Sequence, residues 1–363
     1  MLFLIPELET SLGIFLLNET MKAAVLKSPG TINLGHVLIP DCPAGGLLVK
    51  VTVCAVCSTD TRMFKSGHRD LVYLRVLGHE IAGIVAQSKS ELFEPGVRVQ
   101  IYPGIGCGEC VDCLNDDSRH CKALKILGFS ADGGFAEYVS VPGSTVTAGG
   151  VNKIPESIAD VEAALSEPLA SCINAQEKIN VGCGDAVLVI GAGPLGLIHA
   201  RLSRRRGAGS VIIVDRLRQR LETAFELGRA DVVVNTQGDD LSQAIMAETR
   251  GRGVDVVILA TGQISLAQLF PLLADNGRLS LFSGIKEEPG LSAAVINQLH
   301  YRELRLSGAY GSTPVQNTEA LNLIAEGFPV LDLITAQFDL ESIDEGLEYT
   351  SACRGLKAVI CNP

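Results

Sequence analysis

The sequence predicts an α/β plus β protein, in which one part is rich in short strands and another is built on a parallel sheet. From about residue 22 to 165, apolar segments such as Leu47–Val53 and Ile81–Ala86 alternate with glycine and proline, which is typical of a compact β-rich domain. From about 170 to 307, apolar runs alternate with amphipathic stretches, and the last segment is mixed again. The pattern predicts a βαβ domain that is either inserted into the β-rich part or combined with it end to end.

The βαβ part is predicted from β-branched or apolar runs that are separated by helical periodicity. The expected strands are Val187–Ile190, Val211–Val214, Val232–Val234, Val254–Leu259 and Leu279–Phe282. The expected helices include Leu195–Arg206 and Arg216–Leu227. Strands joined by helices form a parallel sheet with right-handed crossovers. A final apolar strand is expected at Lys357–Cys361.

Length and composition indicate a globular protein with a large core. The chain has 363 residues, which suits roughly two domains of about 150 residues each. Hydrophobic residues make up 47% and charged residues 20%, and the net charge is −11. An acidic surface repels phosphate backbones, so nucleic acid is not an expected partner. The apolar runs are shorter than the ~18 residues that cross a bilayer, so a membrane is not expected either.

The first 20 residues are interpreted as an appended segment or an upstream start. The segment lacks a basic beginning, carries Glu7, Glu9 and Glu19, and has no small-residue cleavage site of a signal peptide. Met21–Val25 follows at once and is expected to form the first strand. Eleven cysteines without a secretion signal favour the reducing cytoplasm. In that compartment, grouped cysteines bind metal more often than they form disulfides.

A glycine-rich turn follows the first predicted strand of the βαβ part and opens a helix. Gly191 allows the tight turn, Gly193 lets the backbone approach a pyrophosphate, and Gly196 lets helix and strand pack closely. Pro194 and Leu195 begin the helix, whose free N–H groups attract phosphate. The context therefore predicts a dinucleotide site, and a nucleotide-free glycine turn is the alternative.

An acidic residue in the expected place favours NAD over NADP. Asp215 ends the next apolar run, about 20 residues on, where a carboxylate accepts hydrogen bonds from the ribose hydroxyls and repels a 2′-phosphate. Arg216 and Arg220 leave NADP open, because a guanidinium can hold that phosphate. Ser283, after a later strand, is also assigned to the cofactor site.

Four cysteines lie in one short glycine- and aspartate-rich segment. Cys107, Cys110, Cys113 and Cys121 fit a Zn²⁺ ion with a closed tetrahedral shell, which leaves no position for water. This zinc is therefore expected to be structural. An iron–sulfur cluster and a disulfide pair are the alternatives. The neighbouring His120 is expected to be a bystander.

A second, scattered set has the chemistry of a catalytic zinc site. Cys57 follows a strand, His79 and Glu80 precede another, and Glu167 lies where the β-rich part meets the βαβ part. Taken singly, each residue has an ordinary structural reading. Together, a thiolate, an imidazole and a carboxylate bind Zn²⁺ and leave a position for water or a substrate oxygen.

The ordered motifs of the chain give a more specific indication. From about Met21 to the C-terminus it resembles the zinc-containing medium-chain alcohol and polyol dehydrogenases, in particular the sorbitol/threonine dehydrogenase-like branch. The resemblance lies in "CSTD", "GHE", the four-cysteine segment, "GGFAEY", "EPLA", "GAGPLG" and "SGAYGS".

The resemblance implies a Rossmann NAD(P)-binding domain inserted into a GroES-like catalytic domain. The implied division is an N-terminal extension over 1–20, the catalytic domain over 21–166 with a structural zinc lobe at about 103–123, the Rossmann domain over 167–307 and the completion of the catalytic domain over 308–363. The family also implies a homodimer or homotetramer.

The resemblance also assigns roles to the scattered residues. Cys57, His79 and Glu80 correspond to catalytic zinc ligands and the adjacent carboxylate, and Glu167 to the third protein ligand, with Cys172 as the alternative. Asp60 corresponds to the residue that orients His79. The expected cofactors are therefore two Zn²⁺ ions per chain and NAD.

The implied reaction is hydride transfer between a secondary alcohol, such as a polyol, a sugar-like molecule or an amino alcohol, and NAD(P). Thr59 matches the family's hydroxyl in the proton relay. Arg62 stands where some relatives have a relay histidine, and since an arginine stays charged, His68 or water is the alternative. Two other functions stay open: a scaffold with a decayed site that keeps only the structural zinc, and a zinc-free quinone reductase. A redox sensor that uses the clustered thiols is a third.

Overall fold

The computed structural model describes residues 19–227, 230–262, 264–285 and 291–362. They form two compact units. The first contains the chain up to Ala170 and from Ser312 onward, and the second is Ser171–Gly311. We propose that these units are the two domains, with each boundary four residues later than the sequence suggested. Residues 1–18 of the predicted N-terminal extension lie outside the described residues.

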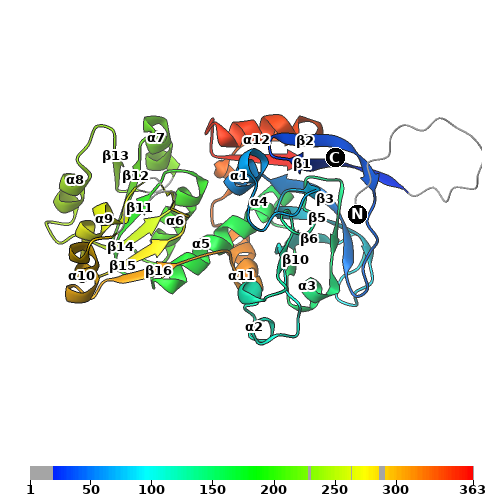
Figure 1. The fold of residues 1–363 in the computed structure, drawn as a ribbon, viewed down its shortest axis with the longest axis horizontal. Helices are drawn as coiled ribbons and strands as arrows, with labels where there is room; N and C mark the ends of the chain where they lie inside the picture. The colour runs from blue at the N-terminus through cyan, green and yellow to red at the C-terminus, as the bar shows by residue number, and fades with distance from the viewer. Residues whose placement is uncertain (1–18, 228–229, 263, 286–290, 363) are drawn as a thin grey trace, which may run out of the picture. The chain divides into compact units, whose positions relative to one another are not determined.

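The second unit is a parallel six-stranded sheet with helices around it (Figure 1). The strand order is β13-β12-β11-β14-β15-β16, the order of a doubly wound dinucleotide-binding sheet. The strands are β11 (Ala186–Ile190), β12 (Ser210–Asp215), β13 (Val232–Asn235), β14 (Val254–Leu259), β15 (Leu273–Leu281) and β16 (Arg305–Gly308). The helices are α6 (Pro194–Arg205), α7 (Arg218–Leu227), α8 (Leu241–Glu248), α9 (Leu266–Leu269) and α10 (Ala293–Tyr301).

The burial of each strand explains whether its sequence predicts a strand. All five residues of β11 are buried, because β11 lies inside a sheet that is covered on both faces, and its sequence is continuously apolar. The edge strand β16 is mostly exposed and mixes arginine, serine and glycine with one leucine. The sequence pattern therefore did not predict β16, whereas all five strands that it predicted for this unit are present.

The first unit is built around a mostly antiparallel seven-stranded sheet with the order β10-β6-β5-β3-β18-β17, in which β9 also pairs with β3. The edge pair β17 and β18 is parallel. A three-stranded sheet, β2-β1-β4, and the small pair β7-β8 complete it. The N-terminal strands are β1 (Thr20–Ser28), β2 (Thr31–Leu38), β3 (Leu47–Ala55), β4 (Arg75–Val76) and β5 (Glu80–Ser88). They are followed by β6 (Arg98–Ile101), β7 (Gly104–Ile105), β8 (Lys125–Ile126), β9 (Tyr138–Val141), β10 (Val151–Lys153), β17 (Ile334–Asp339) and β18 (Lys357–Cys361).

Short helices cover parts of this unit, and one helix contains its boundary. The helices are α1 (Ser58–Ser66), α2 (Val111–Leu114), α3 (Gly143–Thr147), α4 (Asp160–Ala164), α11 (Pro314–Ala325) and α12 (Ile343–Ser351). The boundary falls within α5 (Ser166–Lys178).

The last strand shows how the two units are connected along the chain. β18 pairs with β3, with Ile360 opposite Cys54, so segments from before and after the second unit share one sheet. The βαβ unit is therefore inserted into the β-rich unit, which settles the alternative that the sequence left open. The predicted α/β plus β fold class is confirmed.

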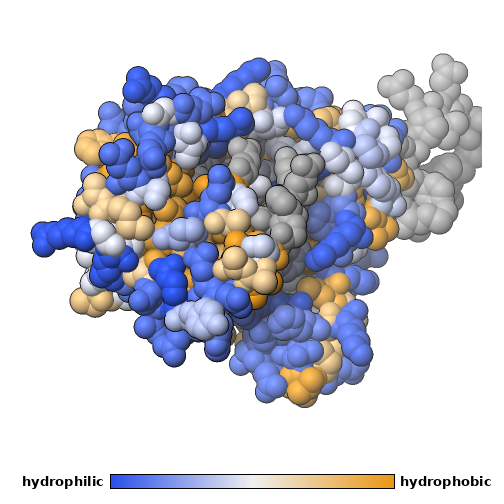
Figure 2. Space-filling view, turned by 60° about the vertical axis from the view of Figure 1, so that its left-hand side comes forward, coloured by the Kyte–Doolittle hydropathy of each residue, from blue (hydrophilic) through white to orange (hydrophobic). Residues whose placement is uncertain are grey.

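On the face shown in Figure 2, hydrophilic side chains predominate and hydrophobic ones are scattered among them. Within the described ranges, no helix has both the length and the apolar character that a membrane span requires.

Candidate metal centres and dinucleotide-binding turn

The sheet of the first unit brings three of the scattered residues together. One ligand atom from each of Cys57, His79 and Glu80 lies within 4.8 Å of the others. Cys57 follows β3 and precedes the first residue of α1, while Glu80 is the first residue of β5. Since β3 and β5 are antiparallel and Ala55 is opposite Glu80, the end of one strand meets the start of the other. Strand pairing therefore assembles the cluster.

Asp60 fixes the two segments that carry these residues. Its Oδ2 accepts a hydrogen bond of 2.9 Å from the backbone N–H of Cys57, and its Oδ1 accepts one of 3.3 Å from that of Gly78. Oδ1 also lies 3.2 Å from Nδ1 of His79. The two groups lie within ion-pair distance, but Nδ1 has no hydrogen bond of accepted geometry among the described residues. A carboxylate beside Nδ1 favours Nε2 of His79 as the nitrogen for a metal, so Asp60 stays the candidate for orienting the ring.

The environment of His79 is buried and negatively charged. Burial alone lowers the pKa of its imidazole, but the Asp60 carboxylate and the Cys57 thiol together raise it well above the ordinary value. Gly78, directly before it, has φ = 92°, and a Cβ there would lie 2.7 Å from the sulfur of Cys54. Only glycine fits this turn, which explains the "GHE" motif.

Lys357 is a site residue that the sequence analysis missed. Its Nζ lies 2.6 Å from Oε1 of Glu80, and both side chains are buried. Burial lowers the pKa of Lys357, but Glu80 and Cys57 raise it above the ordinary value. A lysine at the start of an apolar C-terminal strand was the available signal, but only the pairing of β18 with β3 places it here.

The residues fit a zinc ion. A thiol, an imidazole and a carboxylate are the donors that Zn²⁺ takes in catalytic sites. Lys357 holds one oxygen of Glu80, whereas Oε2 is buried and has no hydrogen-bond partner among the described residues. An orphaned buried carboxylate oxygen is costly unless an ion or water satisfies it.

Glu167, at the second position of α5, is not among the residues whose ligand atoms lie within 4.8 Å of one another, but its carboxyl interacts electrostatically with His79 and Glu80. Burial raises its pKa to about 7, and the neighbouring His79 lowers it in part. The alternative, Cys172, is buried and its thiol donates to the carbonyl oxygen of Leu195, at 3.9 Å. The resemblance to the polyol branch keeps Glu167 as the proposed third ligand and Cys172 as its alternative.

Two further residues of α1 were assigned to the proton relay. Thr59 is half-buried in the first turn of α1, directly beside the cluster in sequence. Arg62, one turn later, is exposed. The positions keep Thr59 as a candidate and give no support to a relay through Arg62.

The four-cysteine segment forms the second metal-ligand cluster. One sulfur from each of Cys107, Cys110, Cys113 and Cys121 lies within 4.8 Å of the others. β7, α2 and a 3₁₀ turn at Ser118–His120 carry the loop, and His120 is exposed. Four converging sulfurs fit the closed shell of a structural zinc.

Backbone N–H groups of this loop donate hydrogen bonds to its cysteine sulfurs. The N–H of Cys110 donates to the sulfur of Cys107 at 3.4 Å, and the N–H of Cys107 donates to that of Cys121 at 3.5 Å. Backbone N–H groups at Glu109 and Cys110 lower the pKa of Cys107 to about 7. A Cβ at Gly106 would lie 2.7 Å from the sulfur of Cys113, so glycine is required there. The backbone N–H of Gly108 lowers the pKa of Cys113, but burial and the other three thiols raise it to about 12. Before any ion binds, the loop therefore favours a charged sulfur at Cys107 and a neutral thiol at Cys113.

In the second unit, the glycine turn has the geometry that a pyrophosphate requires. It connects β11 to α6, with Gly193 before the first helical residue, Pro194, and Leu195 in the first turn. Gly191 has φ = 112°, and a Cβ at Gly196 would lie 1.8 Å from the carbonyl oxygen of Gly191. Side chains are therefore excluded where phosphate approaches the helix N-terminus.

Asp215 lies at the carboxyl end of β12, beside this turn. Its Oδ2 accepts a hydrogen bond from the N–H of Ala192 at 2.8 Å, and its Oδ1 accepts one from Leu217 at 2.9 Å. Two backbone donors thus hold the carboxylate in one orientation, as a ribose-binding acid requires.

The remaining cofactor candidates differ in their surroundings. Arg220 points to the glycine turn: its Nη1 would lie 3.5 Å from a Cβ at Gly193. Its Nε is buried and finds no hydrogen-bond partner in the part of the chain that the structure describes. Arg216 is exposed. Ser283 follows β15, and its N–H donates to the carbonyl of Leu259 on β14. The structure thus places Arg220 closer to the phosphate-binding turn than the sequence could indicate.

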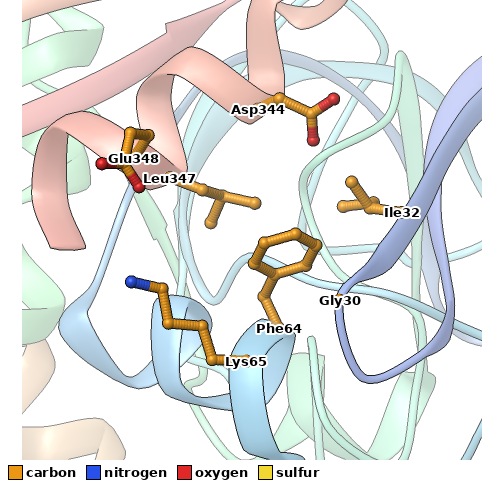
Figure 3. A pocket seen from close by; sticks show the side chains of 7 residues that line it. All are labelled: Gly30, Ile32, Phe64, Lys65, Asp344, Leu347 and Glu348. Carbon is orange, nitrogen blue, oxygen red and sulfur yellow. The ribbon is translucent and has the colours of Figure 1, made fainter.

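A surface pocket of about 240 Å³ lies elsewhere in the first unit (Figure 3). The side chains of Phe64, Ile32 and Leu347 form its apolar part. The other lining residues are Gly30, Lys65, Asp344 and Glu348. None of the metal-ligand candidates lines it, so we assign it no part of the chemistry.

Comparisons with known proteins agree with this geometry. The family model of the alcohol dehydrogenase GroES-like domain matches residues 43–153, and that of the zinc-binding dehydrogenase matches residues 194–326. An uncharacterised zinc-type alcohol dehydrogenase-like protein of Haemophilus influenzae is 31% identical over 85% of this chain and 88% of its own. D-altritol 5-dehydrogenase of Agrobacterium fabrum is 31% identical over 80% of this chain and 84% of its own.

A solved structure is similar over nearly the whole length. It is a zinc-binding dehydrogenase of Sinorhizobium meliloti bound to NADP, with a TM-score of 0.85 and 30% identity, covering 95% of this chain and all of that one. The chain belongs to the zinc-type medium-chain alcohol dehydrogenases, as the sequence predicted, and is an NAD(P)-dependent alcohol dehydrogenase.

Proposed function

We propose that the protein interconverts a secondary alcohol of a polyhydroxylated or amino-alcohol substrate and the corresponding ketone, with NAD as the preferred coenzyme. The observation that carries the proposal is the Cys57–His79–Glu80 cluster, in which Asp60 orients the imidazole and a carboxylate serves as a candidate third ligand. Glu167 is the carboxylate expected in the polyol branch. The relative named D-altritol 5-dehydrogenase supports the same substrate class.

Each residue has a distinct role in this proposal. Cys57, His79 and Glu167 would hold the catalytic zinc, with Glu80 beside them. A zinc ion held there would supply Lewis acidity to the substrate hydroxyl, and a bound nicotinamide would accept the hydride. Thr59 accepts the hydroxyl proton and passes it outward.

Lys357 pairs with Glu80 and limits how the carboxylate can act. Since Oε1 is bound to Lys357, only the buried Oε2 would be available to a metal ion. In our proposal Glu80 would therefore be an occasional rather than a permanent ligand. The Lys357 charge also offsets part of the negative charge of the site.

The coenzyme preference rests on Asp215. Its fixed carboxylate accepts hydrogen bonds from ribose hydroxyls and repels a 2′-phosphate. Arg220 at the glycine turn binds the diphosphate in this proposal. The NADP found in the Sinorhizobium meliloti relative makes a direct comparison of the two coenzymes necessary.

The four-cysteine cluster holds a second, structural zinc. We further propose that the protein is a cytoplasmic homodimer or homotetramer without nucleic-acid or membrane partners. The acidic net charge and the eleven cysteines support these points.

The test is a screen of polyols, inositols, amino alcohols and simple secondary alcohols with NAD or NADP, followed by nicotinamide absorbance. We expect NAD-dependent oxidation of at least one polyol or amino alcohol, by protein that contains two zinc ions per chain. A protein with one zinc and no turnover on any alcohol would instead be the decayed scaffold. Turnover of quinones by zinc-free protein would make it a quinone reductase.

A further inference from the structure

His68 is a histidine near the catalytic cluster that the mechanism above does not use. Its side chain is 19% exposed, so most of the ring is enclosed by protein. It lies in the loop between α1 and β4, where the N–H of Leu71 donates to its carbonyl at 3.1 Å. Its surroundings connect it to the proposed zinc ligand His79.

One phenyl ring contacts both imidazoles. The ring of Phe129 lies 5.4 Å from that of His68, edge to face at 87°, and 5.3 Å from that of His79, at 60°. Phe129 is buried, and its carbonyl accepts a hydrogen bond from Val72 in the His68 loop. The phenyl ring thus sets His68 at a fixed place, one aromatic ring away from the reacting centre.

The hydrogen bonds of His68 define what its ring can offer. The N–H of Asp70 donates to Nδ1 at 3.2 Å, whereas the Asp70 carboxylate oxygen Oδ2 lies farther away, at 3.7 Å. Nδ1 is therefore the acceptor, and the neutral ring carries its proton on Nε2. Among the residues that the structure describes, Nε2 makes no hydrogen bond. Burial lowers the pKa of His68, Arg69 and Arg62 lower it further, and Asp70 opposes them. At neutral pH the ring therefore offers one N–H donor.

We propose that Nε2–H of His68 donates a hydrogen bond to a second hydroxyl of the substrate, while the reacting hydroxyl lies at the Cys57–His79 cluster. Phe129 forms the apolar wall between the two positions. The inference rests on the proposed function and adds to it: His68 selects polyhydroxylated substrates over simple secondary alcohols. A site that is built to bind a hydroxyl rejects an analogue without it, because a polar group is left unpaired.

The test compares two substrates in the full-length, zinc-loaded enzyme. The probes are pentan-2-ol, which has no second hydroxyl, and the best substrate among sorbitol, xylitol and ribitol. The variant His68→Phe keeps an aromatic ring against Phe129 and removes the donor. We expect kcat/KM to fall roughly tenfold to a hundredfold for the polyol and to change less than about twofold for pentan-2-ol.

Two further variants sharpen the test. His68→Gln keeps an N–H donor and should recover part of the polyol activity. His36→Phe, at an exposed histidine of β2, is the matched control and should leave kcat/KM unchanged for both substrates. Zinc content and thermal stability are measured for every variant, so a folding or metal defect is recognised as such.

Several results would overturn the inference. If His68→Phe lowers kcat/KM equally for the polyol and for pentan-2-ol, or shifts the pH profile of pentan-2-ol oxidation, His68 acts in proton transfer instead. Sorbitol 6-phosphate serves as a third probe: if its kcat/KM alone falls in His68→Phe, the loop recognises anions through Arg62 and Arg69. A wild-type enzyme that oxidises pentan-2-ol as well as the polyols refutes the inference but keeps the dehydrogenase function, whereas no turnover of any alcohol refutes both.

Discussion

The two metal-ligand clusters of the first unit are assembled in opposite ways. In the lobe, Cys107 and Cys121 are only 14 positions apart, and the loop that carries them contains its own glycines and N–H···S bonds. In the catalytic cluster, Glu80 and Lys357 are 277 positions apart and meet only because β18, β3 and β5 are neighbours. The lobe is thus a local structure, whereas the catalytic cluster exists only when the whole sheet has formed.

The largest effect is expected at the catalytic cluster. Cys57→Ser should lower kcat by at least about 10³-fold, since several kcal/mol of charge stabilisation depend on the metal. NADH binding, measured by fluorescence, should persist because the glycine turn lies in the other unit. Cys353→Ser, at an exposed cysteine, is the control. Full turnover by Cys57→Ser would remove Cys57 from the site.

The second largest effect is a loss of stability when the long-range ion pair between Lys357 and Glu80 is broken. Lys357→Met leaves the Glu80 carboxylate buried and unpaired, which should lower the free energy of unfolding by about 3–5 kcal/mol. Chemical denaturation measures this loss. The double variant Lys357→Met/Glu80→Gln should recover part of the stability, because the uncompensated charge is gone. If the single variant is as stable as the wild type, the ion pair does not support the cluster.

A smaller and more local loss is expected in the lobe. Cys110→Ser should lower the free energy of unfolding by roughly 2–4 kcal/mol through loss of the structural zinc, while the folded fraction keeps most of its kcat. Cys183→Ser, exposed and outside the lobe, serves as the matched control. A stable Cys110→Ser protein without catalysis would show that the lobe takes part in the chemistry.

The smallest effect is expected in coenzyme selection. Asp215→Ala should lower the ratio of kcat/KM for NAD to that for NADP by about tenfold, since the 2′-phosphate is no longer repelled. Initial rates with both coenzymes test it. An unchanged ratio would transfer the discrimination to Arg216 and Arg220.

The same contrast explains what the sequence could predict. The lobe was predicted from the spacing of its cysteines, and the buried strands from their continuous apolar runs. The edge strand β16 has no such run, and no pattern within β18 relates Lys357 to Glu80, because that contact depends on which strands pair. Cys57, His79 and Glu80 were expected from a family resemblance, and only the register of β3 with β5 explains why they meet.

The contact of Phe129 with His68 and His79 could not be predicted for a related reason. The three residues come from separate loops, and each is ordinary by itself. Their arrangement depends on the hydrogen bond from Val72 to Phe129, which joins two of these loops. Side-chain positions that depend on loop–loop contacts leave no periodic signal in the sequence.

The most direct test is the zinc content of three purified proteins, measured by mass spectrometry of the metal. We expect two zinc ions per chain in the wild type, and one in Cys57→Ser and in Cys110→Ser, with only the second variant keeping turnover. A wild type with a single zinc, or a Cys57→Ser protein that keeps both ions, would contradict the existence of two independent metal centres.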